Sequence, residues 1–357
     1  MKKYIILFLI IMTINSCQVD NPEPLDNTWE LINSFSSKII VEISSDDNYI
    51  YFTTLDGFYK MTSDGTIVDS TKVQYKHFGD FRVATKMYST DFLIPELKYA
   101  YDRFGNPIAW DRVLSYYSID DKLLYTIRVA DFYEPHTYFG VLIPSDNNSL
   151  NNSRNKALIF LSQNNDATSN NFLIEYSIVK DINDQVQFSI INKFDLPTSF
   201  GSDHLIAFQD KYLLTGNNET DILTADGNFK KILNYPFREF KSIRDSVYGF
   251  QQYSIFVSNE NLEQWDEISI QGFSHRRVFI IDDKFVNLGG IPEVIDIQNR
   301  QLIWLDTKGI KNIYNSDLNR EQFPSTTAIK EFKGRVYLFT TTGIYSKKTE
   351  DLFNTEK

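Results

Sequence analysis

The stretch Asp46 to Gly65, DDNYIYFTTLDGFYKMTSDG, recurs near the other end of the chain as Lys333 to Asp351, KGRVYLFTTTGIYSKKTED. In both copies a polar turn precedes four apolar or aromatic residues. A threonine run, a glycine, an aromatic residue and a second polar turn then follow. Two short apolar runs joined through such residues are typical of a β-hairpin. The recurrence of one hairpin at both ends predicts a chain built from repeats of it.

Short apolar runs bounded by Asp, Asn, Gly and Ser continue along the chain between these two copies. After residue 27 no stretch keeps apolar residues at the spacing that a long amphipathic helix needs. Many of the runs are continuous rather than alternating, as is typical of strands covered on both faces. The sequence therefore predicts an all-β fold, with strands at Ile39 to Ile43, Tyr49 to Phe52, Leu123 to Val129, Ala157 to Leu161, Phe188 to Ile191, Tyr212 to Leu214, Val278 to Ile281, Gln301 to Leu305 and Val336 to Phe339.

The second strands of the hairpins can be aligned, and their spacings of roughly 33 to 59 residues average close to the length of a propeller blade. A four-stranded meander cannot bury both faces alone, so such units stack radially around a shared core. We therefore expect a β-propeller of seven blades over residues 27–357, with six or eight blades, a β-sandwich, or two stacked β-domains as alternatives. The aligned pairs are Phe58-Tyr59, Tyr116-Tyr117, Glu175-Tyr176, Ile222-Leu223, Ile255-Phe256, Val294-Ile295 and Ile344-Tyr345.

The first residues of the expected propeller resemble one of its outer strands. Asn27 to Ile32 (NTWELI) is similar to Glu263 to Ile268 (EQWDEI), which is a fourth strand in this alignment. Few residues remain after Phe353 to give the last hairpin a fourth strand of its own. We expect Trp29 to Ile32 to pair with that hairpin, which would close the ring and leave no exposed edge.

Four hairpins are followed by a turn that resembles the Asp-box of sialidases and related propellers, in a degenerate form. Ser258 to Trp265 keeps the serine and the tryptophan, and Ser346 to Phe353 keeps the serine and an aromatic residue. Thr62 to Gly65 and Thr224 to Gly227 keep a hydroxyl, an aspartate and a displaced glycine. The resemblance implies a scaffold only, because a hydroxyl and a carboxylate in such turns cap backbone amides. The clustered arginines and Arg-Ile-Pro start of sialidases are missing.

The N-terminus has the pattern of a secretory signal, with two lysines before the apolar run Tyr4 to Met12. The segment Ile14-Asn15-Ser16-Cys17 resembles the lipobox of bacterial lipoproteins. That resemblance implies a signal peptide at residues 1–16, a palmitate-type lipid on Cys17, and a spacer up to residue 26. Gln18, rather than an aspartate, directly follows the cysteine, which resembles the sorting pattern of outer-membrane lipoproteins. We therefore expect a lipid-anchored protein of the bacterial cell envelope, in the outer membrane. The alternative is a signal cleaved elsewhere, with an incidental thiol.

Composition and motifs exclude several kinds of chemistry. The net charge of -11 repels phosphate backbones, so we expect no nucleic-acid partner. Cys17 is the single cysteine, and the four histidines, His77, His136, His204 and His275, lack ligand spacing. We therefore expect no metal and no cofactor. Neither a Gly-x-Ser-x-Gly motif nor a glycine-rich phosphate loop is present, and we assign no catalytic residue.

Candidate binding residues lie in or beside segments expected to be long loops, at residues 70–112, 130–155 and 162–171. They are Tyr101, Arg103, Trp110, Tyr133 and His136. Variable loops on a fixed scaffold are where binding sites are usually built, and these side chains suit a glycan or a protein. The alternative is that these aromatic residues fill gaps between irregular blades.

The sequence thus favours a membrane-tethered, non-enzymatic propeller that serves as a binding or scaffold module for an envelope protein or glycan. One alternative is a carbohydrate-active enzyme, a glycoside hydrolase or lyase, with acidic residues at the channel mouth. It requires two carboxylates within about 10 Å in a concave pocket. A second alternative is an assembly factor for a membrane complex, which would reveal itself by co-purification.

Overall fold

The computed structural model describes most of the chain after the leader. The described residues are 28–35, 40–45, 47–54, 57–72, 86–88, 91–101, 103–104, 107–118, 122–128, 138–142, 156–165, 168–180, 186–196, 204–208, 211–215, 218–224, 226–258 and 262–353. The expected signal peptide, Cys17 and the spacer lie outside them. In the described part of the chain no helix is both long and apolar enough to span a membrane.

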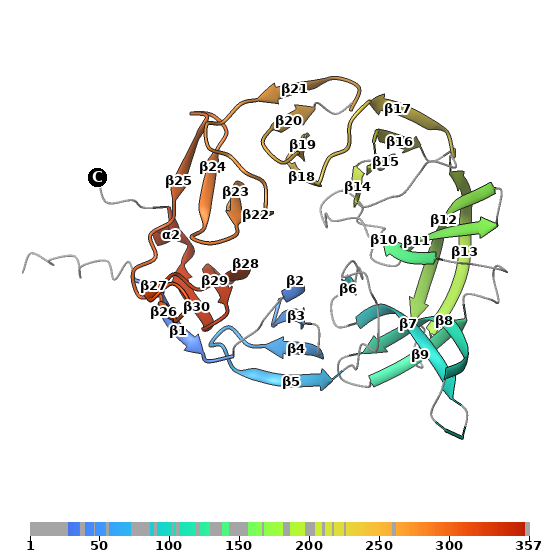
Figure 1. The fold of residues 1–357 in the computed structure, drawn as a ribbon, viewed down its shortest axis with the longest axis horizontal. Coiled ribbons are helices and arrows are strands. Elements are labelled where there is room, and N and C mark those ends of the chain that lie inside the picture. Colours follow the sequence, from blue (N-terminus) through green and yellow to red (C-terminus); the bar gives the residue numbers. More distant parts are fainter. Residues whose placement is uncertain are drawn as a thin grey trace, which may run out of the picture.

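The described residues form seven four-stranded antiparallel sheets that stand around a common centre (Figure 1). In ring order, sheet 1 is β2 (Ile40–Ser45), β3 (Ile50–Thr54), β4 (Gly57–Met61) and β5 (Ile67–Lys72). Sheet 2 is β6 (Lys86–Tyr88), β7 (Asp91–Tyr101), β8 (Pro107–Ser118) and β9 (Lys122–Arg128). Sheet 3 is β10 (Tyr138–Leu142), β11 (Lys156–Asn165), β12 (Thr168–Lys180) and β13 (Val186–Leu196).

The remaining sheets follow the same meander. Sheet 4 is β14 (His204–Phe208), β15 (Lys211–Thr215), β16 (Thr220–Thr224) and β17 (Phe229–Leu233). Sheet 5 is β18 (Glu239–Ile243), β19 (Ser246–Phe250), β20 (Ile255–Ser258) and β21 (Trp265–Ile268). Sheet 6 is β22 (Arg277–Ile281), β23 (Lys284–Leu288), β24 (Glu293–Asp296) and β25 (Gln301–Trp304). Sheet 7 is β28 (Thr326–Phe332), β29 (Arg335–Thr340), β30 (Gly343–Lys348) and β1 (Glu30–Asn33).

The radial arrangement confirms the expected β-propeller. Each of the seven aligned residue pairs lies in the third strand of a different sheet. Consecutive residues are buried where the apolar runs are continuous: Ile50, Tyr51 and Phe52 each have 0% exposure. Both faces of such a strand are covered because neighbouring sheets pack face to face. Sheets 5 and 6, for example, share a cluster that contains Phe250 and Phe285.

The ring closes through the N-terminal strand, as expected. β1 pairs antiparallel with β30, with Leu31 opposite Tyr345, and is the outer strand of sheet 7. Trp29, just before β1, is 3% exposed. Its backbone N–H donates to Lys308 O at 2.8 Å and its indole Nε1–H donates to Asp306 O at 2.8 Å. The beginning and the end of the fold therefore share one sheet (Figure 1).

Two of the Asp-box-like turns share one geometry. Asp64 Oδ1 accepts the backbone N–H of Thr66 at 3.0 Å and lies 2.5 Å from the Thr62 hydroxyl. The second turn repeats the hydroxyl–carboxylate contact between Thr224 and Asp226. Gly65 and Gly227 adopt φ values of 87° and 85°, which a glycine accommodates without strain. These turns are structural, since their polar groups satisfy one another and the local backbone.

The other two Asp-box-like segments differ from each other. The Ser258 hydroxyl donates to Gln264 O at 2.7 Å, and Trp265 Nε1–H donates to Leu262 O at 3.0 Å, so this turn closes on itself. The expectation of such a turn from residue 346 to residue 353 is wrong. Ser346 lies in β30 and accepts from Arg335 Nε at 2.9 Å, and the short helix α2 (Thr349–Leu352) follows.

Two of the expected loops are also largely strand. β7 and β8 pair along their whole length, from Asp91 opposite Ser118 to Tyr101 opposite Pro107. β11 and β12 likewise pair up to Asn165 opposite Thr168. Polar residues such as the Asn-rich run have low β-propensity, but pairing with a neighbouring strand satisfies their backbone groups and overrides it.

Candidate functional site

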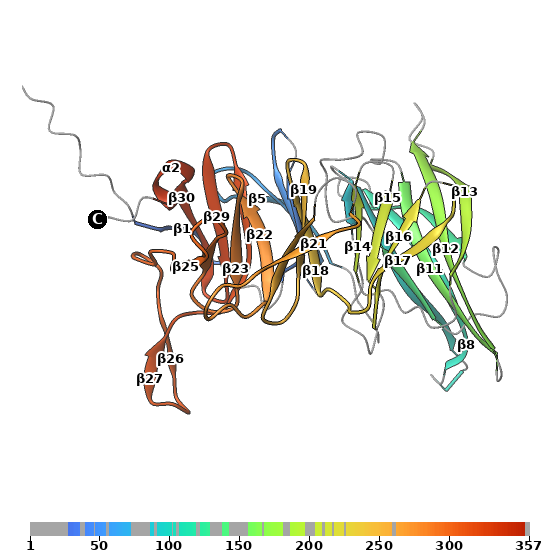
Figure 2. The same ribbon diagram turned by 90° about the horizontal axis from the view of Figure 1, so that it is seen from above.

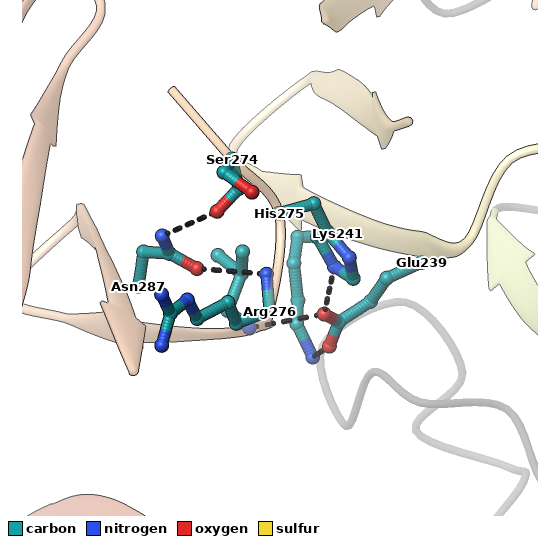
Figure 3. Close-up of polar contacts among 7 residues, drawn as sticks. Glu239, Lys241, Ser274, His275, Arg276 and Asn287 are labelled. Carbon is teal, nitrogen blue, oxygen red and sulfur yellow. Dashed lines mark hydrogen bonds and ion pairs between the residues drawn. The ribbon is translucent and has the colours of Figure 1, made fainter. Parts of the chain in front are cut away.

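A polar cluster lies where two neighbouring inner strands, β18 and β22, begin (Figure 3). Glu239, the first residue of β18, accepts from Lys241 Nζ through Oε1 at 2.9 Å. Its Oε2 lies 3.0 Å from His275 Nε2 and accepts the backbone N–H of Val278 at 3.0 Å. Both carboxylate oxygens therefore have partners inside the protein. The cluster joins inner strand β18 to inner strand β22.

The electrostatics of Glu239 favour the ionised form. Burial would raise the pKa of Glu239, but Lys241 and the hydrogen bonds from His275 and Val278 lower it to about 2. A carboxylate that stays ionised at neutral pH accepts hydrogen bonds and cannot act as a general acid. Glu239 is thus suited to positioning the two strands.

Further contacts at the same end of the ring fix the neighbouring segments. Asn287 Nδ2 donates to Ser274 O at 3.0 Å, and Asn287 Oδ1 accepts from the Arg276 backbone N–H at 3.2 Å. Arg277 Nη1 donates to Ile40 O at 2.5 Å and to Thr327 O at 3.0 Å. The guanidinium of Arg277 therefore connects sheets 1, 6 and 7, and this end of the ring is a rigid support.

A groove of about 890 Å³ lies at the opposite ends of these strands. Glu239 begins β18, whereas Arg244 and Asp245, which line the groove, lie in the turn that follows β18. The β22–β23 and β24–β25 turns, Trp304 and α2 complete its walls. Figure 2 shows α2 at one face of the disc and the hairpin of β26 (Ile313–Asn315) and β27 (Arg320–Gln322) extending from the other. The groove therefore belongs to the α2 face.

The groove walls come from two neighbouring sheets that are joined at the rim. Arg244 Nη2 of sheet 5 lies 3.0 Å from Asp283 Oδ2 of sheet 6. Asp282 and Asp283 both have positive φ, 48° and 55°, as a two-residue type I′ hairpin requires. This turn type matches the twist of the flanking strands, so the position of the two aspartates is set by the hairpin.

Other charged groups of the groove are also held. The backbone N–H of Asn299 donates to Asp296 Oδ1 at 3.0 Å, and Asn299 Nδ2 donates to Asp296 Oδ2 at 2.8 Å. Side-chain and backbone hydrogen bonds from Asn299 hold the pKa of Asp296 below its usual value. Lys284 Nζ lies 3.8 Å from the centre of the Phe353 ring. Trp304, by contrast, is 59% exposed.

Those residues proposed from the sequence that the structure describes lie elsewhere. Tyr101 ends β7 and Trp110 lies inside β8, a strand where we expected a loop, so both belong to the long hairpin of sheet 2. Arg103 is exposed in the turn of that hairpin, with its guanidinium 4.7 Å from the Phe104 ring centre. Tyr133, His136 and Cys17 lie outside the described residues. The structure thus places three of the candidates on one hairpin, away from the groove of sheets 5 and 6.

Sequence analysis missed Glu239, His275 and Trp304. The alternation of Glu239 and Lys241 in the inner strand EFKSI was the available signal, since charges at alternate positions share one side of a strand. Of the histidines, His204 begins β14, His275 belongs to the cluster, and His77 and His136 fall outside the described residues. Within those residues no group of three potential metal ligands occurs.

Comparison with known proteins supports the fold alone. No family model matches the chain, and no curated protein matches it in sequence. The WD40 domain of Neurospora crassa Pan2 is similar over 93% of this chain and 97% of its own, with 10% identity and a TM-score of 0.55. The extracellular domain of BT4673 from B. thetaiotaomicron is similar over 90% of this chain, with 12% identity and a TM-score of 0.51. The chain spans only 40% of that second structure. Together with the sheet topology, these likenesses show that the chain folds as a β-propeller.

Proposed function

We propose that this β-propeller is a non-enzymatic binding or scaffold module for a protein or glycan, tethered to the outer membrane of a bacterial cell through lipid on Cys17. The lipobox-like segment that ends at Cys17 supports the tether. The geometry of β1 supports it too, because β1 is the outer strand of sheet 7. An anchor attached ahead of this outer strand would hold the disc by its rim and leave both faces accessible.

The groove on the α2 face is the observation that carries the binding function. It combines turns of sheets 5 and 6, and its volume of about 890 Å³ lies within the 300–1,000 Å³ typical of ligand sites. The sheets that present it are fixed by the Glu239 cluster and by Arg277. Preformed sites on rigid supports bind without a large ordering cost.

At the Glu239 cluster and in the groove, the two carboxylates whose pKa values are shifted support binding over hydrolysis. Glycoside hydrolysis needs one carboxylic acid with a raised pKa beside a second carboxylate. Glu239 has a pKa lowered to about 2 and both oxygens occupied, and the pKa of Asp296 is lowered as well. Neither provides the acid that the enzyme alternative requires.

The tether can be tested by expressing the full chain in a bacterial host and labelling with an alkyne analogue of palmitate. The wild type should be labelled and sediment with membranes, whereas the Cys17→Ala variant should be unlabelled and released. Label on the variant would contradict the tether.

Binding can be tested by retaining envelope proteins and glycans on the immobilised full chain and analysing both the retained material and the supernatant. We expect a retained component with no new reducing ends. Release of reducing ends from envelope glycans would support the enzyme alternative instead, and retention of nothing would contradict the binding function.

A further inference from the structure

Three tryptophans have described side chains, and one differs from the other two. Trp29 is 3% exposed and donates its indole N–H to Asp306 O. Trp265 packs 5.0 Å from the Phe237 ring centre and donates its indole N–H to Leu262 O. Trp304 is 59% exposed, and within the described part of the chain its indole N–H has no hydrogen-bond partner. Tryptophan is usually largely buried with its N–H paired, so Trp304 has both a ring face and a donor available.

Trp304 stands in the wall of the groove rather than on a convex surface. The β24–β25 turn brings Gln298 and Asn299 to the same groove, and the β18–β19 turn brings Asp245. Gln298, Asn299 and Asp245 are all polar with planar end groups. In the described residues no ion pair engages Asp245, whereas Arg244 and Asp283 neutralise each other at 3.0 Å. The groove therefore offers one aromatic face and several hydrogen-bonding groups.

The charges of the groove select among ligand classes. A net charge of -11 disfavours polyanions. A strongly cationic peptide would need a series of unpaired carboxylates, but Asp283 is paired with Arg244 and Asp296 is bonded by Asn299. Among the described groove residues this leaves only Asp245 and Asp282 without an ion pair or such a bond. An uncharged sugar has an apolar ring face that can cover an indole and a rim of hydroxyls that donate and accept hydrogen bonds. That combination matches the groups that the groove leaves available.

We infer that the groove binds an uncharged oligosaccharide, with Trp304 stacked on a sugar ring and Asp245, Gln298 and Asn299 hydrogen-bonded to its hydroxyls. This inference rests on the proposed binding function and assigns the ligand class. The indole contributes stacking and its free N–H, so its removal should affect affinity far more than it affects folding.

The test measures tryptophan fluorescence and titration calorimetry on the full chain with four probes: maltohexaose, cellohexaose, xylohexaose and mannohexaose. At least one should bind and change the fluorescence. Trp304→Ala should then weaken binding by about tenfold or more, equivalent to about 1.4 kcal/mol. Trp304→Phe, which keeps an aromatic face, should lose less. Tyr253→Ala is the matched control, because Tyr253 is a 71% exposed aromatic residue outside the groove, and it should bind as the wild type does.

Two outcomes would overturn the inference. One is that none of the four sugars binds at about 10 mM, a concentration that detects even millimolar sites. The other is that Trp304→Ala and Tyr253→Ala bind equally well. Binding of a decalysine peptide that Asp245→Asn abolishes, without sugar binding, would assign the groove to a cationic peptide. In each of these cases a retained envelope component would still support the proposed function.

Discussion

Replacement of Trp29 by alanine tests whether the N-terminal strand closes the ring. The Trp29 side chain is 3% exposed, and it lies among the apolar residues of sheets 6 and 7, including Val286 and Leu338. Its indole N–H donates to Asp306 O, and Lys347 Nζ lies 5.9 Å from its ring centre. Trp29→Ala therefore removes a packed ring, a hydrogen bond and the cover of a buried lysine.

The expected loss follows from these contacts. Truncation of a buried aromatic residue costs about 3–5 kcal/mol, and the lost hydrogen bond adds about 1 kcal/mol. In a domain of this size each kcal/mol lowers the melting temperature by about 1.5 °C, so we expect a fall of about 6–9 °C. Trp304→Ala is the control, since removal of an exposed side chain changes stability by less than about 0.5 kcal/mol.

Gly309 provides a second perturbation of the same contact. Gly309 has a φ of 95°, and a Cβ there would lie 2.2 Å from Trp29 O. Gly309→Ala should therefore displace Trp29 and lower the melting temperature. The Trp29→Ala/Gly309→Ala double variant should lose less stability than the sum of the two single losses, because both substitutions disrupt the same packing of Trp29. Melting followed by circular dichroism measures all four variants. Equal melting of Trp29→Ala and Trp304→Ala would refute ring closure as a source of stability.

Two further substitutions test buried carboxylates. Glu239→Gln should lower stability at neutral pH by about 3 kcal/mol. Because folding lowers the pKa of Glu239 to about 2, its ionised carboxylate stabilises the fold fully above the unfolded pKa and loses this effect as the pH falls towards 2. Denaturant unfolding should therefore show the stability difference between wild type and Glu239→Gln shrinking from pH 5 towards pH 2. A stability difference that does not depend on pH would contradict the ion-pair assignment. Asp221 has the opposite behaviour, since burial and the nearby Glu219 raise its pKa to about 6 and its Oδ2 has no hydrogen-bond partner among the described residues. The free energy of unfolding of Asp221→Asn should therefore rise by about 2–3 kcal/mol relative to that of the wild type as the pH increases from 4 to 8. Curves of unfolding free energy against pH that run parallel for the two proteins would contradict the raised pKa of Asp221.

The amino-acid sequence by itself determined the strands and their grouping. Hairpins such as residues 46–65 are specified locally, by apolar runs of strand length and by turns with glycine at positive φ. The likeness of NTWELI to EQWDEI was enough to predict that β1 pairs with β30. Local patterns failed where pairing overrode propensity, as in the β7–β8 hairpin, and where β30 continued into α2 instead of an Asp-box-like turn.

Only the tertiary structure decided which side chains meet. Glu239 and His275 are 36 residues apart, and Arg277 reaches the carbonyl of Ile40 across 237 residues. The groove likewise combines turns of two sheets with the helix that follows a third. The sequence could not distinguish the exposed Trp304 from the buried Trp29, because Trp29 directly precedes one outer strand (ELIN) and Trp304 ends another of similar composition (QLIW). The difference arises from how neighbouring sheets pack around the ring, which depends on contacts between segments far apart in the chain.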